Sequence, residues 1–320
     1  MYKSASPLAL RPFVVAIGGA NMDVLARTPV PLAPHDSTPG EIQCASGGVA
    51  RNVAENLARL EVDVRLISVV GDDVFGRRLR EDTARAGVNV DAMHTLMGQR
   101  TASYVSMHGP DGEMVVAVND MAILDCLTPA LLQTHADLLR LADCIVVDCN
   151  LSANSLAWVL QKDTDAPVFV DAVSVAKCTR LTPLLTRIHT LKVNRLEAQA
   201  LAGQAVQSVD DALVVCRQLH AMGARNVVLS LGQDGACWCD ASGQIGHQTA
   251  RAVQIVNTNG AGDAMTAGLV QAHLAGEPLG QAVEWASACA QITLCSALAN
   301  APTLSVSTVQ SQLIPFLNHP

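Results

Sequence analysis

The sequence predicts an α/β protein in which a mainly parallel sheet is covered by helices on both faces. Short apolar runs without charges recur along the chain, and stretches with apolar residues at three- and four-residue intervals separate them. Unbroken apolar runs are typical of parallel strands buried on both faces, and the alternation of the two patterns indicates crossover connections. We therefore expect a three-layer α/β/α sandwich.

The expected strands and helices follow one another in order from residue 13. The expected strands are 13–17, 64–70, 144–147, 168–170, 188–191 and 227–231, and the helices between them are 49–60, 73–86, 129–141, 155–161, 195–202 and 210–222. Beyond these, we expect a strand at 236–239, a further strand reaching residue 256, and apolar helices over 264–275 and 279–297.

Two stretches contain no crossover helix and are expected to form a small β-lid. Residues 24–46 hold four prolines and a short extended piece at 41–45, and residues 101–120 are typical of a hairpin. Long excursions are often functional, although hairpins without a role would leave the same pattern. Because free strand edges find partners, a homodimer through the lid is a hypothesis.

The composition favours a large folded core. Of the 320 residues, 50% are hydrophobic and 16% are charged, and the net charge is −8 with no basic patch. Such a chain can bury enough apolar surface to fold, and its charge disfavours nucleic acid as a partner. We find no linker or repeat in the sequence, so residues 1–320 are expected to form a single domain.

The sequence also favours a cytoplasmic protein without a membrane partner. Residues 1–12 form a short polar tail, and the apolar run after it is too short for a signal peptide. No stretch approaches the about 18 consecutive apolar residues that a membrane span requires. The ten cysteines include no Cys-x-x-Cys pair, so buried reduced thiols are expected rather than a zinc site.

The most informative motif is Gly260-Ala261-Gly262-Asp263, which opens a helix after an apolar segment and a polar turn. Free amides at a helix start, together with the helix dipole, favour an anion such as phosphate. Asp263 in the first turn could accept a proton from an attacking hydroxyl, or simply be stabilised there by the dipole. The motif predicts phosphoryl transfer without a P-loop, since no Gly-x-x-x-x-Gly-Lys-Ser/Thr occurs.

Two further motifs suit a nucleotide and its metal ion. Asn194 and Glu197 lie one helical turn apart after a strand, where they could hold water bound to Mg²⁺ or form a capping box. Ser230, Gly232 and Gly235 form a turn that could pass close to a nucleotide, or be an ordinary hairpin turn.

Other small and polar residues stand where a small polar ligand could be held. They begin a helix (Gly47, Gly48, Asn52) or follow the ends of strands (Asn21, Asp23, Asn150, Asp171). Open α/β sheets bind ligands at the carboxyl ends of their strands, although each residue could equally be a cap. The absence of a Gly-x-Gly-x-x-Gly fingerprint argues against a nicotinamide-dependent oxidoreductase.

Taken in order, these motifs resemble the PfkB (ribokinase-like) family of sugar and nucleoside kinases over residues 13–299. The resemblance implies a ribokinase-like fold and transfer of phosphate from ATP, with Mg²⁺, to an alcohol group. It implies Asp263 as the base, with Gly260, Ala261 and Gly262 as the anion cradle. It further implies a metal set (Asn194, Glu197), a nucleotide set (Asn194, Ser230, Gly232, Gly235, Thr258, Gly260, Gly262) and a sugar set (Asn21, Asp23, Gly47, Gly48, Asn52).

Within the family the chain is most similar to the pseudouridine kinases, through residues 18–23, 47–52, 118–121, 148–150, 171–174 and Lys177. This similarity implies the 5′-hydroxyl of pseudouridine as the acceptor, and adds Asn119, Asn150, Asp171 and Lys177 to the substrate set. A kinase for ribose, a hexose or another nucleoside is the alternative. A non-catalytic sensor of nucleosides or nucleotides on the same fold is a further one.

The chain departs from the family pattern at Asn257. Family members often carry an aspartate there, which helps some of them to hold a monovalent cation. Asparagine lacks the charge, so the departure puts activation by potassium in doubt.

Overall fold

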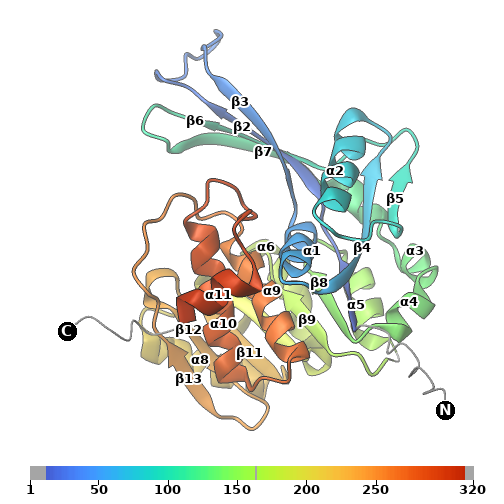
Figure 1. Ribbon diagram of the computed structural model, residues 1–320, viewed down its shortest axis with the longest axis vertical. Helices are drawn as coiled ribbons and strands as arrows, with labels where there is room; N and C mark the ends of the chain where they lie inside the picture. The colour runs from blue at the N-terminus through green and yellow to red at the C-terminus, as the bar shows by residue number, and fades with distance from the viewer. Residues whose placement is uncertain (1–11, 163, 314–320) are drawn as a thin grey trace, which may run out of the picture.

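A computed structural model describes residues 12–162 and 164–313 of the chain, and its centre is one nine-stranded sheet (Figure 1). The strand order is β13-β12-β11-β10-β9-β8-β1-β4-β5, parallel except at β12 and β13. These strands are β1 (Phe13–Ile17), β4 (Asp63–Gly71), β5 (Met93–Leu96), β8 (Cys144–Asp148), β9 (Val168–Asp171), β10 (Thr190–Asn194), β11 (Asn226–Ser230), β12 (Ala236–Cys239) and β13 (Ile245–Gln248).

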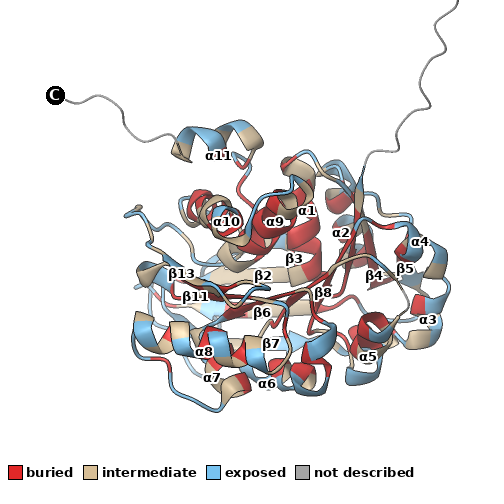
Figure 2. Ribbon diagram, turned by 90° about the horizontal axis from the view of Figure 1, so that it is seen from below, coloured by how far each residue is buried: buried red, intermediate tan, exposed pale blue. Residues whose placement is uncertain are grey.

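Helices cover both faces of this sheet, as Figure 2 shows from below. One layer holds α1 (Val49–Arg59), α2 (Val74–Arg85), α9 (Ala261–Leu274), α10 (Leu279–Leu294) and α11 (Val306–Leu313). The other holds α3 (Pro129–Gln133), α4 (Ala136–Leu141), α5 (Ala153–Gln161), α6 (Val175–Cys178), α7 (Arg195–Ala202), α8 (Val209–Ala221) and the 3-10 helices η1 (Ala122–Cys126) and η2 (Thr179–Arg187). The expected three-layer α/β/α sandwich is confirmed.

The central strands are unbroken apolar runs because both of their faces are buried. In β1, Val15 and Ile17 belong to the core under α3–α8, whereas Val14 and Ala16 belong to the core under α1, α9 and α10. All four side chains are fully buried. Removing apolar surface from water on both sides of the sheet is the main force that holds the three layers together.

The lid is a separate four-stranded sheet that extends beyond the helices (Figure 1). Its strands are β2 (Asn21–Arg27), β3 (Glu41–Gly47), β6 (Ser103–His108) and β7 (Met114–Asp120), in the order β3-β2-β6-β7. The 103–107 and 114–118 hairpin was expected, but β2 was not. Its sequence mixes polar and apolar residues, because a lid strand has only one partly covered face.

The two faces of the lid differ in chemistry. One cross-strand row contains Asp23, Tyr104 and Asn119, and the next row on that face contains Gln43, Leu25 and Ser106. The opposite face carries a row of Ile42, Ala26, Met107 and Val116, with Val118 in the row beside it. We call these the polar lid face and the apolar lid face. Ile42 and Val118 are 71% and 67% exposed.

Three sequence-based expectations were wrong. β13 ends at Gln248, and residues 249–256 form no strand. This segment runs beside α10 instead, where Val256 N–H donates to the Leu294 carbonyl at 2.8 Å. The helix expected over 129–141 is interrupted between α3 and α4, where the Thr134 hydroxyl donates to the Leu131 carbonyl at 2.6 Å. α10 stops at Leu294 rather than at residue 297.

Other sequence-based expectations concern the ends of the chain and the thiols. Apart from Pro12, the polar tail expected at the amino end lies outside the described residues. All ten cysteines are free, and seven are buried, as expected. No helix within residues 12–313 is long and apolar enough to cross a bilayer.

Candidate active site

The first turn of α9 carries the motif that sequence analysis singled out. Gly260 is the residue before the helix and adopts a left-handed conformation, with φ of 80°, which glycine tolerates at no steric cost. Ala261, Gly262 and Asp263 follow within the first turn. The Asp263 carboxylate accepts a hydrogen bond from Asn52 Nδ2 at 2.8 Å. Two residues chosen independently, from α1 and α9, therefore meet.

Asp263 lies in an environment that opposes its ionisation. Burial, followed by the nearby carboxylate of Asp171, raises the pKa of Asp263 to about 8. The hydrogen bond from Asn52 and the ammonium of Lys192 act in the opposite direction. A carboxylate with a pKa near neutral is matched to accepting and releasing a proton at physiological pH.

Lys192 is a buried cation beneath the anion cradle, and sequence analysis missed it. Its Nζ lies 3.1 Å from a carboxylate oxygen of Asp171, and both side chains are almost fully buried. A Cβ atom added at Gly262 would lie 2.6 Å from this Nζ, so the ammonium sits directly against the first turn of α9. Burial alone would lower the pKa of Lys192, but the carboxylates of Asp171, Glu197 and Asp263 raise it, so the lysine stays charged.

Asp171 and Thr266 complete this cluster. The Thr266 hydroxyl donates to Asp171 at 2.9 Å from one turn beyond Asp263 on α9. Strand register places Lys192 beside Asp171, because β10 and β9 are parallel neighbours. One signal could have revealed Lys192 in the sequence: it is the single charge between the expected strand 188–191 and Asn194.

The predicted sugar-binding residues gather at the base of the lid. Asn21 Nδ2 donates to Asp23 at 2.6 Å. A Cβ at Gly47 would overlap the Asp23 carboxylate, and Gly48 has a φ of 102° at the start of α1. Gly47 therefore leaves room for the Asp23 carboxylate, and Gly48 lets the start of α1 lie against the backbone of Gly19 and Ala20. Burial raises the pKa of Asp23.

A second polar cluster joins the ends of β1 and β8. The buried Asp148 carboxylate accepts hydrogen bonds from the amides of Gly19, Ala50 and Asn150, each at 2.9 Å. It thereby fixes the start of α1 and the turn before β2. Asn150 Oδ1 accepts from Lys177 Nζ at 2.5 Å, so two residues predicted to bind substrate touch each other. Burial lowers the pKa of Lys177.

The residues predicted to bind the nucleotide fall into two groups. Ser230, Gly232, Gly235, Thr258 and Gly262 line one cavity of about 570 Å³, which α10 closes with Ser287 and Gln291. Val253 and Ile255, from the segment after β13, also line it. Asn194 and Gly260, the two remaining predicted contacts, do not line this cavity.

Asn194 and Glu197 form the capping box that was the alternative interpretation. Glu197 accepts from both the backbone and the side-chain amide of Asn194 at 2.8 Å, and its own amide donates to Asn194 Oδ1 at 3.0 Å. Burial raises the pKa of Glu197. These oxygens suit Mg²⁺ through bound water rather than by direct contact. Within residues 12–162 and 164–313, no three His, Cys, Asp or Glu residues form a metal cluster.

A further cavity of about 580 Å³ lies under the polar lid face. Asp23 and Gln43 from the lid, Arg51 from α1, and Asn257 and Asn259 before α9 line it. Consecutive residues before α9 therefore face two different cavities, with Thr258 on the nucleotide side. Ala261 and Gly262, in the first turn of α9, line the nucleotide-side cavity, and no residue of this turn lines the cavity under the lid.

Asn119 stands apart from the other predicted site residues, on the third strand of the lid counted from β2. It lies on the polar lid face in the same row as Asp23, with β6 between their two strands. Strand spacing separates the two backbones by about 10 Å. Asn119 is exposed, and no side-chain contact joins it to the other predicted residues within the described part of the chain.

Comparison with known proteins identifies the family. The family model of the pfkB family carbohydrate kinases matches residues 11–305. The chain belongs to the PfkB family. Membership makes it a phosphotransferase with an alcohol group as acceptor and implies ATP as the phosphoryl donor, as the resemblance of its motifs indicated.

Individual relatives refine this assignment. The chain is 41% identical to the pseudouridine kinase of Escherichia coli K12, covering 93% of this chain and 96% of that one. It is 39% identical to the uncharacterized sugar kinase YeiI of the same strain, covering 95% and 84%. The Arabidopsis thaliana ribokinase complexed with ribose and ATP shares the fold, with a TM-score of 0.86 at 20% identity over 94% and 98% of the two chains.

Proposed function

We propose that this PfkB kinase transfers the γ-phosphoryl group of ATP to the 5′-hydroxyl of pseudouridine. The observation that carries the proposal is the hydrogen bond from Asn52 to Asp263, in the first turn of α9, where Ala261 and Gly262 line a nucleotide-sized cavity. The 41% identity to a pseudouridine kinase supports the choice of nucleoside. The almost equal similarity to YeiI makes another sugar or nucleoside the alternative.

In this mechanism the acceptor hydroxyl lies against Asp263, which takes its proton as the new P–O bond forms. The amides of Gly260, Ala261 and Gly262 face the transferring phosphoryl group. The ammonium of Lys192, fixed behind Gly262, adds a permanent positive charge to the same cradle. Phosphoryl transfer depends mainly on positioning and charge neutralisation, and this set of residues supplies both.

Magnesium is part of the same proposal. When bound with the nucleotide, Mg²⁺ neutralises phosphate charge. Asn194 and Glu197 would hold its water shell, because their oxygens are already fixed by the capping box at the end of β10. The nucleotide would lie along Ser230, Gly232, Gly235 and Thr258, where no atom lies within 4 Å of the position that a Cβ of Gly232 would take.

The nucleoside would lie between the base of the lid and α1. Asp23, Asn21 and Asn52 would hold ribose hydroxyls, with Gly47 and Gly48 allowing close approach. Asn150, Asp171, Lys177 and Asn119 complete the proposed substrate set. Aromatic residues make up only 3% of the chain, so polar groups of the lid rather than stacked rings would read a uracil-like base.

A competitive panel tests the substrate. Purified protein with ATP and Mg²⁺ is offered pseudouridine, uridine, other nucleosides, ribose and hexoses together, and phosphorylated products are identified by mass spectrometry. We expect pseudouridine 5′-phosphate to dominate. A dominant sugar phosphate would assign the alternative substrate class, and failure to form ADP with any member would favour a non-catalytic sensor.

Activity is expected to be independent of potassium. Asn257 Nδ2 donates to the Ala297 carbonyl at 3.1 Å, and Asn257 Oδ1 accepts from the Asn259 amide at 3.0 Å. The side-chain amide of Asn257 thus hydrogen-bonds to the Ala297 carbonyl oxygen, which could otherwise coordinate a cation. The rate in potassium chloride should equal that in tetramethylammonium chloride at matched ionic strength, whereas Asn257→Asp should introduce a dependence. Activation of the wild-type protein by potassium would refute this.

We also propose a homodimer formed through the apolar lid face. Its exposed row of Ile42, Met107 and Val116 would bury apolar surface against a second copy. Sedimentation equilibrium should give twice the chain mass. Val116→Lys should produce monomers, because the charge enters the interface, whereas Val30→Lys, also exposed but outside the lid strands, should not. A monomeric wild-type protein would overturn the proposal.

A further inference from the structure

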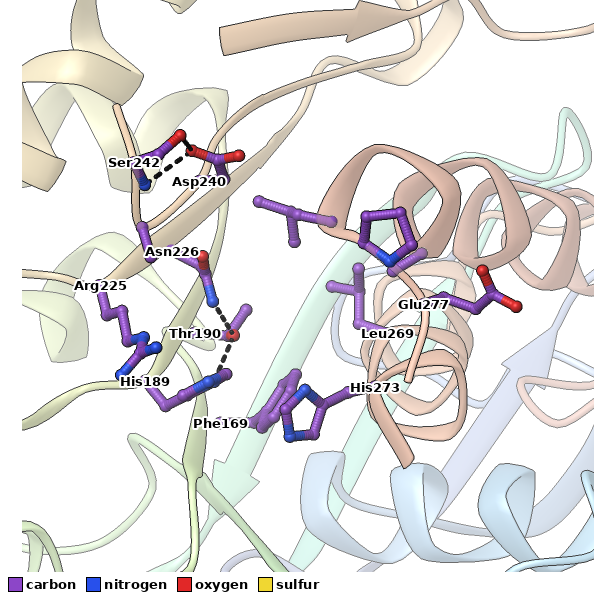
Figure 3. A pocket seen from close by; sticks show the side chains of 14 residues that line it. Phe169, His189, Thr190, Arg225, Asn226, Asp240, Ser242, Leu269, His273 and Glu277 are labelled. Carbon is purple, nitrogen blue, oxygen red and sulfur yellow. Dashed lines mark hydrogen bonds between the residues drawn. The ribbon is translucent and has the colours of Figure 1, made fainter. Parts of the chain in front are cut away.

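A third cavity lies at the end of the sheet opposite the candidate active site. It is lined by Phe169, Thr190 and Asn226, which stand near the amino ends of β9, β10 and β11. The carboxyl ends of the same strands carry Asp171, Asn194 and Ser230. The cavity encloses about 310 Å³, and Figure 3 shows the end of α9 and the turn before α10 across from the strands. No residue assigned above to catalysis, nucleotide or nucleoside lines it.

Two histidines and a phenylalanine form one side of this cavity. The ring centroids of Phe169, His189 and His273 lie 4.8 to 5.4 Å from one another. Figure 3 shows the His189 and His273 rings reaching toward each other, His189 from just before β10 and His273 from the end of α9. Burial, and then the charge of the other histidine, lower the pKa of His189 to about 4, and burial lowers that of His273. Both imidazoles are therefore neutral at physiological pH.

Arg225 brings a full positive charge to the same side. It precedes β11, it is exposed, and its charge lowers the pKa of both histidines. Its guanidinium makes no ion pair or hydrogen bond with any residue in the described part of the chain. Three groups that can carry positive charge thus lie on one side of the cavity, whose two carboxylates, Asp240 and Glu277, lie on its other walls.

The remaining walls of the cavity carry hydrogen-bond acceptors, two of which are carboxylates. Glu277 lies after α9, and Asp240 lies in the turn between β12 and β13. One Asp240 oxygen already accepts from Ser242 and Gln244. Asn226 donates to the Thr190 hydroxyl at 3.3 Å, which leaves its carbonyl oxygen available to a ligand. These groups accept hydrogen bonds from hydroxyls.

We propose that this cavity is a second ligand site, for a small phosphate monoester that carries hydroxyl groups. The phosphate would lie against Arg225, His189 and His273, and the hydroxyls would face Glu277, Asp240 and Asn226. A dianion placed there neutralises the arginine and favours protonation of both imidazoles, and guanidinium–phosphate pairing supplies direction as well as charge. The volume is at the lower end for ligand cavities, which suits a sugar phosphate rather than a nucleoside triphosphate.

Histidine NMR tests this without ATP or nucleoside, so its outcome is independent of the proposed kinase reaction. The imidazole C–H signals of His189 and His273, assigned through His189→Gln and His273→Gln, are followed against pH with ribose 5-phosphate or with inorganic phosphate. We expect ribose 5-phosphate to raise both pKa values by roughly one unit or more, because an opposite charge arrives within contact distance. Inorganic phosphate should do so only at higher concentration.

Two arginine variants sharpen the test. Arg225→Gln should abolish the shift, since the exposed side chain can be replaced without disturbing the fold. Arg77→Gln, an exposed arginine of α2 outside the cavity, should leave the shift unchanged. The proposal is overturned if neither histidine responds to ribose 5-phosphate, or if the response survives in Arg225→Gln. Equal binding of both probes would overturn the part that assigns hydroxyl recognition.

Discussion

Replacing Asp263 by asparagine is expected to lower kcat by about 10²- to 10⁴-fold, the usual contribution of a positioned general base. The asparagine keeps the shape of the carboxylate and can still accept the hydrogen bond from Asn52, so the fold should be retained. Steady-state kinetics with saturating ATP and pseudouridine measure the loss. Asp137→Asn, exposed on α4 in the opposite helix layer, is the matched control and should leave kcat unchanged. Near-normal turnover in Asp263→Asn would remove the aspartate from the mechanism.

The stability of Asp263→Asn relative to the wild-type protein should increase as the pH rises. The pKa of Asp263 is 3.8 in its ordinary state and about 8 in the folded protein, so the folded state binds an extra proton between these values. The contribution of this group to the free energy of unfolding therefore falls as the pH rises through that window. Asparagine has no proton to lose.

Thermal unfolding without ligands measures this difference. The melting temperature of Asp263→Asn minus that of the wild type should grow from about pH 5 to about pH 9. Other groups titrate in both proteins and cancel in the comparison. A constant difference across this range would mean that Asp263 ionises freely in the folded state, and the raised pKa would then be wrong.

Sequence patterns predicted the parts of the molecule that local chemistry determines. The first turn of α9 follows from glycine at a left-handed position and a carboxylate at the positive end of a helix dipole. β1 follows from an apolar run that both layers bury. The capping box of Asn194 and Glu197 was one of two interpretations of these residues. It could be predicted because its two partners are only three residues apart.

Sequence patterns could not predict contacts between segments that are far apart in the chain. Asn52 and Asp263 were selected separately, but 211 positions separate them, and only the packing of α1 against α9 brings them together. Lys192 was missed because a single charge in a strand does not reveal its partner. Residues 249–256 were misread because apolar content alone does not distinguish a paired strand from an unpaired segment such as this one, where Val253 and Ile255 line a cavity.

Replacing Lys192 by methionine is expected to lower both stability and kcat, for two different reasons. The variant leaves Asp171 buried and unpaired, and removing one partner of a buried ion pair costs about 3–5 kcal/mol. It also removes a fixed positive charge from the cradle at Gly262, and losing one such group typically costs about 10²- to 10³-fold in kcat. Thermal unfolding and steady-state kinetics report the two effects separately.

The double variant Lys192→Met/Asp171→Asn distinguishes these two effects. With both charges gone, the melting temperature should return toward that of the wild type, because no unpaired ion is left in the interior. kcat at saturating nucleoside should stay low, because the cradle still lacks its cation. Asp171→Asn alone is the control: it keeps the Lys192 charge and should be faster than the double variant. Recovery of kcat in the double variant, or an equal loss in Asp171→Asn alone, would show that Lys192 serves Asp171 rather than the transferring phosphoryl group.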